Sequence, residues 1–312
     1  MCTPNSTLRR WANAAVSVVI ILTSGVNHTA EAVTTFADGQ THYLNTTIND
    51  TFNLKSSSSL TLPEGNYVIR APKGSESAIR LTMSSTLNVN GGDIIGCDAA
   101  AAVGNAESTT PAGVGIIVGS ASKAEFYNGA TVRGGNHLGA GTLSAKLASD
   151  YFSREYLQKD PEEFYRSNIG GIGGDALIGQ YFGTKIKIHG GNFIAGRGSA
   201  SDGNSLRLSY DAQAEIYGGD YKGAWLAVDG GTIAAYGCFT SVGNRLVGKF
   251  HDGTPLDVQV IERSGGSVKA YENSPGEPDG KKCAKSYHYK SSAAQVYLNF
   301  VWFMMIGFWT LM

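Results

Sequence analysis

A short pattern of alternating residues that ends at two glycines recurs along this chain, and it constrains the fold more than any other feature. The copies read TLNVNGGDIIG, AEFYNGATVRG, IKIHGGNFIAG and AEIYGGDYKG, at 86–96, 124–134, 186–196 and 214–223. Before the glycines, apolar residues alternate with polar ones, which is the period of a β-strand with one buried face. The glycines, or Asn-Gly in the second copy, tolerate the positive φ that a tight turn requires.

A second strand precedes each copy at a nearly constant distance. The upstream segments are AIRL, GIIV, ALIG and SLRL, at 78–81, 115–118, 176–179 and 205–208, and matching residues of the two strands are 10, 10, 11 and 10 positions apart. A fifth, shorter unit follows as AWLAVDGGTIAAYG at 224–237. Constant strands with one connection of variable length are typical of β-solenoid coils, which bury their apolar faces against each other.

The sequence therefore predicts an all-β protein, a right-handed parallel β-helix with one helical insertion and terminal hydrophobic segments. A β-sandwich would not contain similar units separated by long insertions at one corner, and a propeller would need longer four-stranded blades. We expect a cap or first coil at 33–75, coils at 76–262 with a partly helical insertion at 138–175, and a polar stalk at 263–295.

The N-terminal segment 1–32 has the features of a secretory signal. Arg9 and Arg10 precede the apolar run AAVSVVIIL, and Ala30-Glu31-Ala32 fits an A-x-A cleavage site. The alternative is a membrane anchor, for which the apolar run is short.

Secretion changes the interpretation of the cysteines and of the sequons. Removal of the signal would leave Cys97, Cys238 and Cys283, which allow one internal disulfide and one remaining thiol. Asn45 and Asn49 each begin an Asn-x-Thr sequon and are the predicted glycosylation sites.

The segment 296–312 is a second membrane signal, with 17 residues and no charge. Small residues, a polar spacer and an apolar tail are typical of a lipid-anchor signal, and Ser291 is the predicted attachment residue. The spacer after Ser291-Ser292-Ala293 is shorter than usual, so a retained membrane span and a buried terminal strand stay open. The expected location is the secretory pathway, followed by the cell surface or the extracellular space, with contact to a membrane through this tail.

The charge of the chain argues against a nucleic-acid partner. Charged residues make up 16% of the sequence and the net charge is −1, so the sequence lacks the basic patch that nucleic-acid binding needs.

The coil motifs IHGGNFIAG, IYGGDYKG and VDGGTIAAYG resemble the β-helix repeats of the pectate-lyase-like superfold. More narrowly, they resemble the IYGGxF-repeat secreted surface proteins of algae such as diatoms. The resemblance covers roughly 78–262. It implies a polysaccharide partner, since enzymes of this superfold cut polysaccharides with calcium-bound or paired aspartates. The residues to inspect for catalysis are Asp93, Asp220 and Asp229. Because they flank glycines, the alternative is that they are turn residues.

One segment, GGIGGDALI at 170–178, matches the calcium-binding nonapeptide pattern. That site needs successive copies, and the chain has one, so a chance match is the alternative. Asp175 is the one metal candidate, calcium the one candidate ion, and no other cofactor is expected.

Aromatic residues recur beside the glycine turns. The residue before the glycines is Asn90, Tyr127, His189, Tyr217 or Asp229 in the five units. We expect Tyr127, His189, Tyr217 and Tyr221 to form an aromatic strip for glycan binding on one outer face. The alternative is ordinary sheet surface, where aromatic residues are common.

Three functional hypotheses follow. The first is a secreted, surface-anchored β-helix with a structural, adhesive or glycan-binding role and no evident catalytic set. The second is a polysaccharide lyase or glycoside hydrolase on the same fold. The third is a β-helix that has lost catalytic activity.

Overall fold

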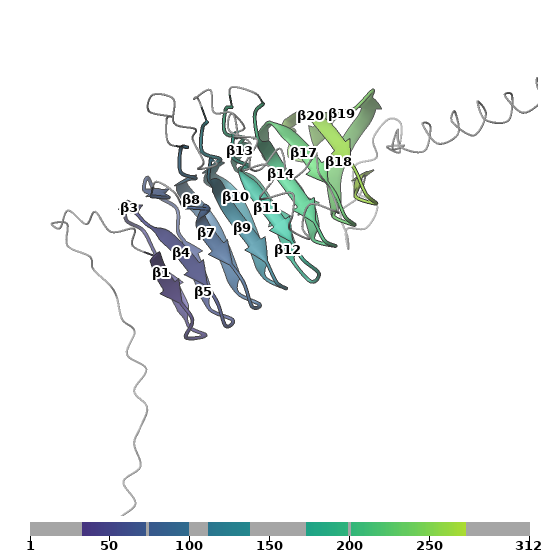
Figure 1. Ribbon diagram of the computed structural model, residues 1–312. Coiled ribbons are helices and arrows are strands. Elements are labelled where there is room, and N and C mark those ends of the chain that lie inside the picture. Colours follow the sequence, from purple (N-terminus) through teal and green to yellow (C-terminus); the bar gives the residue numbers. More distant parts are fainter. Residues whose placement is uncertain (1–32, 73–74, 100–111, 138–172, 199–200, 273–312) are drawn as a thin grey trace, which may run out of the picture. The chain divides into compact units, whose positions relative to one another are not determined.

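The computed structural model describes residues 33–72, 75–99, 112–137, 173–198 and 201–272, all of which lie in the compact unit Glu31–Met312. Every regular element in these ranges is a strand, which confirms the all-β prediction (Figure 1). None of the described residues belongs to a helix long and apolar enough to cross a membrane. Several predicted features lie outside the described residues, namely the signal at 1–32, residues 138–172 of the partly helical insertion, Cys283, Ser291 and the tail at 296–312.

In the described ranges, twenty-one strands form one mostly parallel sheet. In chain order they are β1 (Val33–Phe36), β2 (Thr41–Tyr43), β3 (Ile48–Asn49), β4 (Thr51–Leu54), β5 (Ser59–Leu62), β6 (Val68–Arg70), β7 (Ser77–Leu81), β8 (Thr86–Ile95), β9 (Val114–Gly119), β10 (Lys123–Arg133), β11 (Leu177–Gln180), β12 (Lys185–Ile188), β13 (Asn192–Ile194), β14 (Asn204–Ser209), β15 (Gln213–Ile216), β16 (Asp220–Lys222), β17 (Ala224–Ala227), β18 (Thr232–Val242), β19 (Arg245–Phe250), β20 (Pro255–Glu262) and β21 (Ser267–Tyr271).

Most strands pair in parallel with a strand two or three elements later, so the chain passes the same positions repeatedly. β4, for example, pairs with β1 and β7, and β12 pairs with β10 and β15. We call each passage a coil. The exception is β19, which pairs antiparallel with β18 and β20. Figure 1 shows the coils side by side from β1 to β20. This arrangement is compatible with a β-solenoid.

The register between coils confirms the alignment of the first four repeated units. In the upstream strands, Ile79 pairs with Ile116, and Leu177 pairs with both Ile116 and Leu206. In the following strands the aligned residues are Val89, Phe126, Ile188 and Ile216. The coils extend further than predicted, because β21 lies within 263–295, the stretch expected to be a polar stalk.

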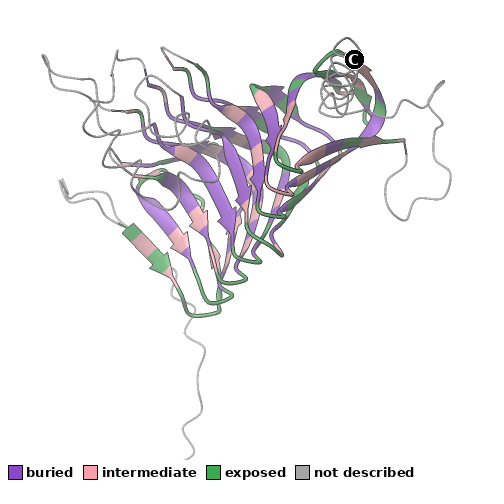
Figure 2. Cartoon of the chain, turned by 45° about the vertical axis from the view of Figure 1, so that its right-hand side comes forward, coloured by how far each residue is buried: buried purple, intermediate pink, exposed green. Residues whose placement is uncertain are grey.

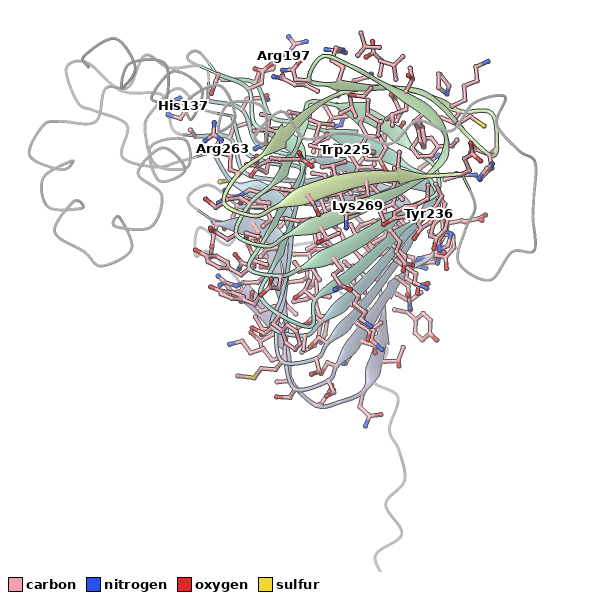
Figure 3. All side chains as sticks on the ribbon, turned by 90° about the vertical axis from the view of Figure 1, so that its right-hand side faces the viewer. His137, Arg197, Trp225, Tyr236, Arg263 and Lys269 are labelled. Atoms are coloured by element: carbon pink, nitrogen blue, oxygen red, sulfur yellow. The ribbon has the colours of Figure 1, made fainter. Side chains whose placement is uncertain are left out.

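The core consists of apolar side chains from every coil, which line the inner face of the strands. Trp225, Phe126 and Phe193 are the largest fully buried ones, and Figure 3 labels Trp225 between the strands. Figure 2 shows burial concentrated along the strands and exposure at the turns. Each such side chain contributes about 1.5–3 kcal/mol, so stacking of coils is the main source of stability.

One corner of the coils consists of glycines whose backbones are in close contact. The amide of Gly135 donates to Gly113 O at 2.8 Å, Gly174 donates to Gly135 O at 2.9 Å, and Gly196 donates to Gly174 O at 2.8 Å. A Cβ on Gly135 would lie 1.7 Å from Cys97 O, and one on Gly196 would lie 1.9 Å from Gly135 O. Segments from different coils lie directly against each other at this corner. They can approach so closely only because the glycines carry no side chains. We call this the glycine corner.

A second corner, between the upstream strand and the strand that precedes the glycine turns, uses two consecutive residues with positive φ. The pairs include Ser56-Ser57, Met83-Ser84, Ser120-Ala121 and Tyr210-Asp211. Asp229-Gly230 lies at this corner as well, because Thr232 pairs with Gln213. The alignment of Gly230-Gly231 with Gly218-Gly219 in the fifth unit was therefore wrong.

We expect Gly135→Ala to lower the free energy of unfolding by about 3 kcal/mol, since the added methyl group would have to displace the backbone of Cys97. The measurement is chemical denaturation of the purified protein.

Gly119→Ala is the matched control, because its Cβ would meet no atom closer than 3.5 Å. It should cost less than about 1 kcal/mol. Equal losses for the two variants would contradict the close approach at the glycine corner.

Candidate functional site

Five aromatic residues occupy one position in five successive coils. The pairs Phe126–Ile188, Ile188–Ile216 and Ile216–Ala235 align the preceding residues, and Tyr236 pairs directly with Tyr271. In-register pairing therefore brings together Tyr127, His189, Tyr217, Tyr236 and Tyr271, which we call the aromatic ladder.

The rings of the aromatic ladder are stacked face to face. Ring centroids are 5.1 Å apart between Tyr127 and His189, 5.2 Å between His189 and Tyr217, 4.8 Å between Tyr217 and Tyr236, and 5.5 Å between Tyr236 and Tyr271. The interplanar angles lie between 7° and 23°. Because neighbours cover the ring faces, the ladder presents ring edges and hydroxyl groups, and it offers ring faces only at its two ends.

Exposure varies along the aromatic ladder. Tyr127 and Tyr271 are 37% and 42% exposed, whereas Tyr236 is 6% exposed. Figure 3 labels Tyr236 on β18 and Lys269 on the adjacent β21. The two ends are thus open to solvent, and so is His189 within the stack. Tyr217 is half-buried, and Tyr236 is the enclosed ring.

A row of charged residues runs beside the aromatic ladder, two residues earlier on each strand. We call it the charged row, and it comprises Glu125, Lys187, Glu215 and Lys269, with the uncharged Ala234 in register between the last two. The hydroxyl of Tyr127 donates to Glu125 Oε2 at 2.9 Å, and that of Tyr217 donates to Glu215 Oε2 at 2.9 Å. Lys187 Nζ lies 3.7 Å from Glu215 Oε2. The site therefore combines phenol groups, carboxylates and ammonium groups at a spacing of one coil.

These contacts change the acidity of two ladder tyrosines. The hydrogen bond to Glu125 is the main cause that raises the pKa of Tyr127, and burial and the charge of Glu125 add to it. Burial is the main cause that raises the pKa of Tyr236, with smaller effects of Glu215 and Tyr271. Both phenols stay protonated to a higher pH than a free tyrosine.

Tyr221, the fourth predicted glycan-binding residue, lies inside the protein and not on the strip. It is 8% exposed, stacks on Phe193 at 5.3 Å and donates to Gly218 O at 2.9 Å. Burial is the main cause that raises its pKa well above the ordinary value. The register explains this position, because Tyr221 aligns with the buried residues Phe193, Val132 and Ile94.

Sequence reasoning missed Tyr236 and Tyr271. The segment IAAYG at 233–237 resembles AEIYG at 214–218, and VKAY at 268–271 continues the same alternation. The glycine pair at 230–231 obscured this signal. Aligning it with the other glycine turns put Asp229 at the ladder position, which Tyr236 occupies in the structure.

The three aspartates proposed for catalysis do not form one site. Asp93, Thr131, Asn192 and Asp220 follow each other in register, so Asp93 and Asp220 are three coil spacings apart. That is roughly 14 Å at the usual strand spacing, beyond the roughly 6.5–9.5 Å between the carboxylates of an inverting glycosidase. Asp229 lies at a different corner.

Asp175, the calcium candidate, is bound by protein donors. Its Oδ1 accepts from the backbone amide of Asn204 at 2.6 Å and from Nδ2 of the same residue at 2.9 Å. Its Oδ2 lies 3.6 Å from Arg207 Nη1. Within the described residues no group of three acidic, histidine or cysteine side chains could hold a metal ion.

The predicted glycosylation sites and cysteines are distributed as follows. Asn45 and Asn49 are exposed and belong to the first coil. Cys97 is a buried free thiol, whereas Cys238 is disulfide-bonded.

Comparisons with protein-family models, with curated proteins and with solved structures return no match to this chain. The resemblance to the pectate-lyase-like superfold therefore stays a prediction.

We expect Glu125→Gln to lower the pKa of Tyr127 toward its ordinary value of about 10, because the substitution removes a charged hydrogen-bond acceptor. The phenolate absorbance of the variant should therefore develop at lower pH than that of the wild type. Because the pKa of Tyr127 is raised in the folded state, its hydrogen bond stabilises the fold fully below about pH 10, the pKa of the unfolded chain. This stabilisation is lost as the pH rises through the pKa of the folded state.

Lys222→Gln, on β16 and away from the aromatic ladder, is the control and should leave the titration unchanged. An identical titration of Glu125→Gln and wild type would contradict the hydrogen bond.

Proposed function

We propose that this chain is a secreted, surface-anchored, right-handed parallel β-helix that binds an extended polysaccharide along the aromatic ladder. The observation that carries the proposal is a face on which the same chemistry recurs once per coil. A right-handed winding follows from the strong preference of parallel crossover connections for that hand.

The periodicity of the aromatic ladder favours a polymer over a small molecule. Neighbouring strands are about 4.8 Å apart, close to the length of one sugar ring in an extended chain. A regular glycan could therefore make the same contact with several successive coils. Weak contacts repeated in this way add up along the chain, as in multivalent binding.

The chemistry of the face also fits a glycan. Sugar hydroxyls donate and accept hydrogen bonds, and the phenols and the charged row offer both functions. The exposed rings of Tyr127 and Tyr271 offer apolar surface at the ends of the ladder. Nothing in this site requires a reaction, so we assign a binding, adhesive or structural role.

Two features support the secretory part of the proposal. A disulfide at Cys238 fits an oxidising compartment. The exposed positions of Asn45 and Asn49 fit glycosylation of the first coil. Attachment through the tail at 296–312 stays part of the proposal.

We expect Tyr217→Ala to weaken polysaccharide binding by about tenfold, or about 1.4 kcal/mol, because it interrupts the aromatic ladder at its centre. The measurement is co-sedimentation of the full-length protein, in mild detergent, with a series of insoluble polysaccharides.

Tyr181→Ala is the matched control, since Tyr181 also stacks on another aromatic ring, Tyr210 at 5.5 Å, but is exposed and lies at a different corner. It should bind like the wild type. Equal loss in both variants, or no binding to any polysaccharide, would refute the proposed site.

We expect a phosphatidylinositol-specific phospholipase to release the protein from the membranes of a eukaryotic host, because the tail fits a lipid-anchor signal. The measurement is the distribution of the protein between the membrane pellet and the supernatant. Replacement of Ser291-Ser292-Ala293 by bulky residues should prevent release. A protein that stays in the pellet with its tail intact would indicate a membrane span.

A further inference from the structure

The aromatic ladder contains two phenol–carboxylate pairs that allow a reaction beyond glycan binding. Tyr127 donates to Glu125, and Tyr217 donates to Glu215, each at 2.9 Å. One-electron oxidation of a phenol releases its proton, and a carboxylate already hydrogen-bonded to the hydroxyl can accept that proton without rearrangement. These two tyrosines are therefore prepared for oxidation to neutral tyrosyl radicals.

Three tyrosines of the ladder stack without interruption. Tyr217, Tyr236 and Tyr271 follow each other with centroid distances of 4.8 and 5.5 Å. At such distances an electron passes readily from one ring to the next. An oxidation that begins at Tyr217, beside Glu215, can thus be transferred through the buried Tyr236 to Tyr271.

The two ends of the ladder are accessible to another molecule. Tyr127 and Tyr271 are 37% and 42% exposed, and the stack presents their edges to solvent. The carbon atoms ortho to the hydroxyl lie on that edge, and they are the positions at which two tyrosyl radicals couple. Stacked neighbours face each other with their ring faces, so coupling within the ladder is disfavoured and coupling between molecules is favoured.

We propose that Tyr127 and Tyr271 are sites of oxidative dityrosine cross-linking between copies of this chain. The oxidant is hydrogen peroxide, activated by a haem peroxidase. This inference does not depend on the proposed glycan binding, since it needs only the stacking, the hydrogen bonds and the exposed ends.

Two phenols, one from each copy, each lose one electron to the activated peroxidase and one proton. Tyr127 passes its proton to Glu125 and from there to water. Tyr271 receives the oxidation from Tyr217, which takes its proton back from Glu215, and Tyr271 releases its own proton to water. The two radicals form a bond between their ortho carbons, and each ortho hydrogen then moves to the phenol oxygen. Hydrogen peroxide takes up the two electrons and two protons and is reduced to two molecules of water.

The test is treatment of the full-length protein with peroxidase and hydrogen peroxide. The readouts are dityrosine fluorescence, covalent dimers on denaturing gels and mass-spectrometric assignment of the linked peptides. Among the described tyrosines, cross-links should involve Tyr127 and Tyr271. The double variant Tyr127→Phe and Tyr271→Phe, which keeps both rings, should remove these links and leave the fold intact.

Two further variants test the role of the carboxylates. Glu125→Gln should slow linkage at Tyr127 by about tenfold, a modest effect for a positioned proton acceptor, and leave linkage at Tyr271 unchanged. Glu215→Gln should slow linkage at Tyr271 and leave linkage at Tyr127 unchanged. A purely structural role of either glutamate would not produce these opposite patterns.

Tyr43 is the internal control, because it is 75% exposed, the most exposed of the described tyrosines. It has no stacking partner or carboxylate partner among the described residues. If linkage follows exposure, Tyr43 should react faster than Tyr127 and Tyr271. That result, or unchanged linkage in both glutamate variants, would overturn the proposal whether or not the protein binds polysaccharide.

Discussion

In-register parallel pairing between coils is the constraint on which the rest of the structure depends. Each backbone position of one coil lies opposite the same position of the next, about 4.8 Å away. A residue type that recurs in the units therefore becomes a continuous row along the stack. Buried apolar rows form the core, and the same rule places five aromatic rings in the aromatic ladder and four charged residues beside it. The stability of the fold and the chemistry of its surface thus have one origin.

Much of this fold could be predicted because the repeated spacing reports the pairing directly. Matching residues such as Val89 and Phe126 align in the structure as they do in the sequence. The corners were harder to predict. Ser120-Ala121 adopts positive φ without glycine, so its turn leaves no signal in the sequence. At the glycine corner, contacts between coils require the absence of a side chain at Gly135, which the sequence cannot distinguish from a flexible loop.

The candidate site was predicted in part, and the errors have a common cause. Tyr127, His189 and Tyr217 precede similar glycine turns, so their alignment was visible. Tyr221 points inward because the alternation of buried and exposed residues does not continue in phase through the Gly218-Gly219 turn. Its pairing with the buried Phe193 is what shows that its side chain faces the core. Tyr236 was missed because a glycine pair at another corner suggested a different register. A glycine pair identifies a turn but does not say which corner of the coil it forms.

The most direct test of the central claim, that the aromatic ladder is the ligand-binding surface, is footprinting of the full-length protein by rapid chemical labelling with and without a polysaccharide. We expect protection of Tyr127, His189 and Lys187, with no change at Tyr181. Protection confined to Asp98 and Arg197, which lie beside the glycine corner, would contradict it. That result would assign ligand binding to the insertion side of the coils and leave the ladder as a device that only stabilises the stack.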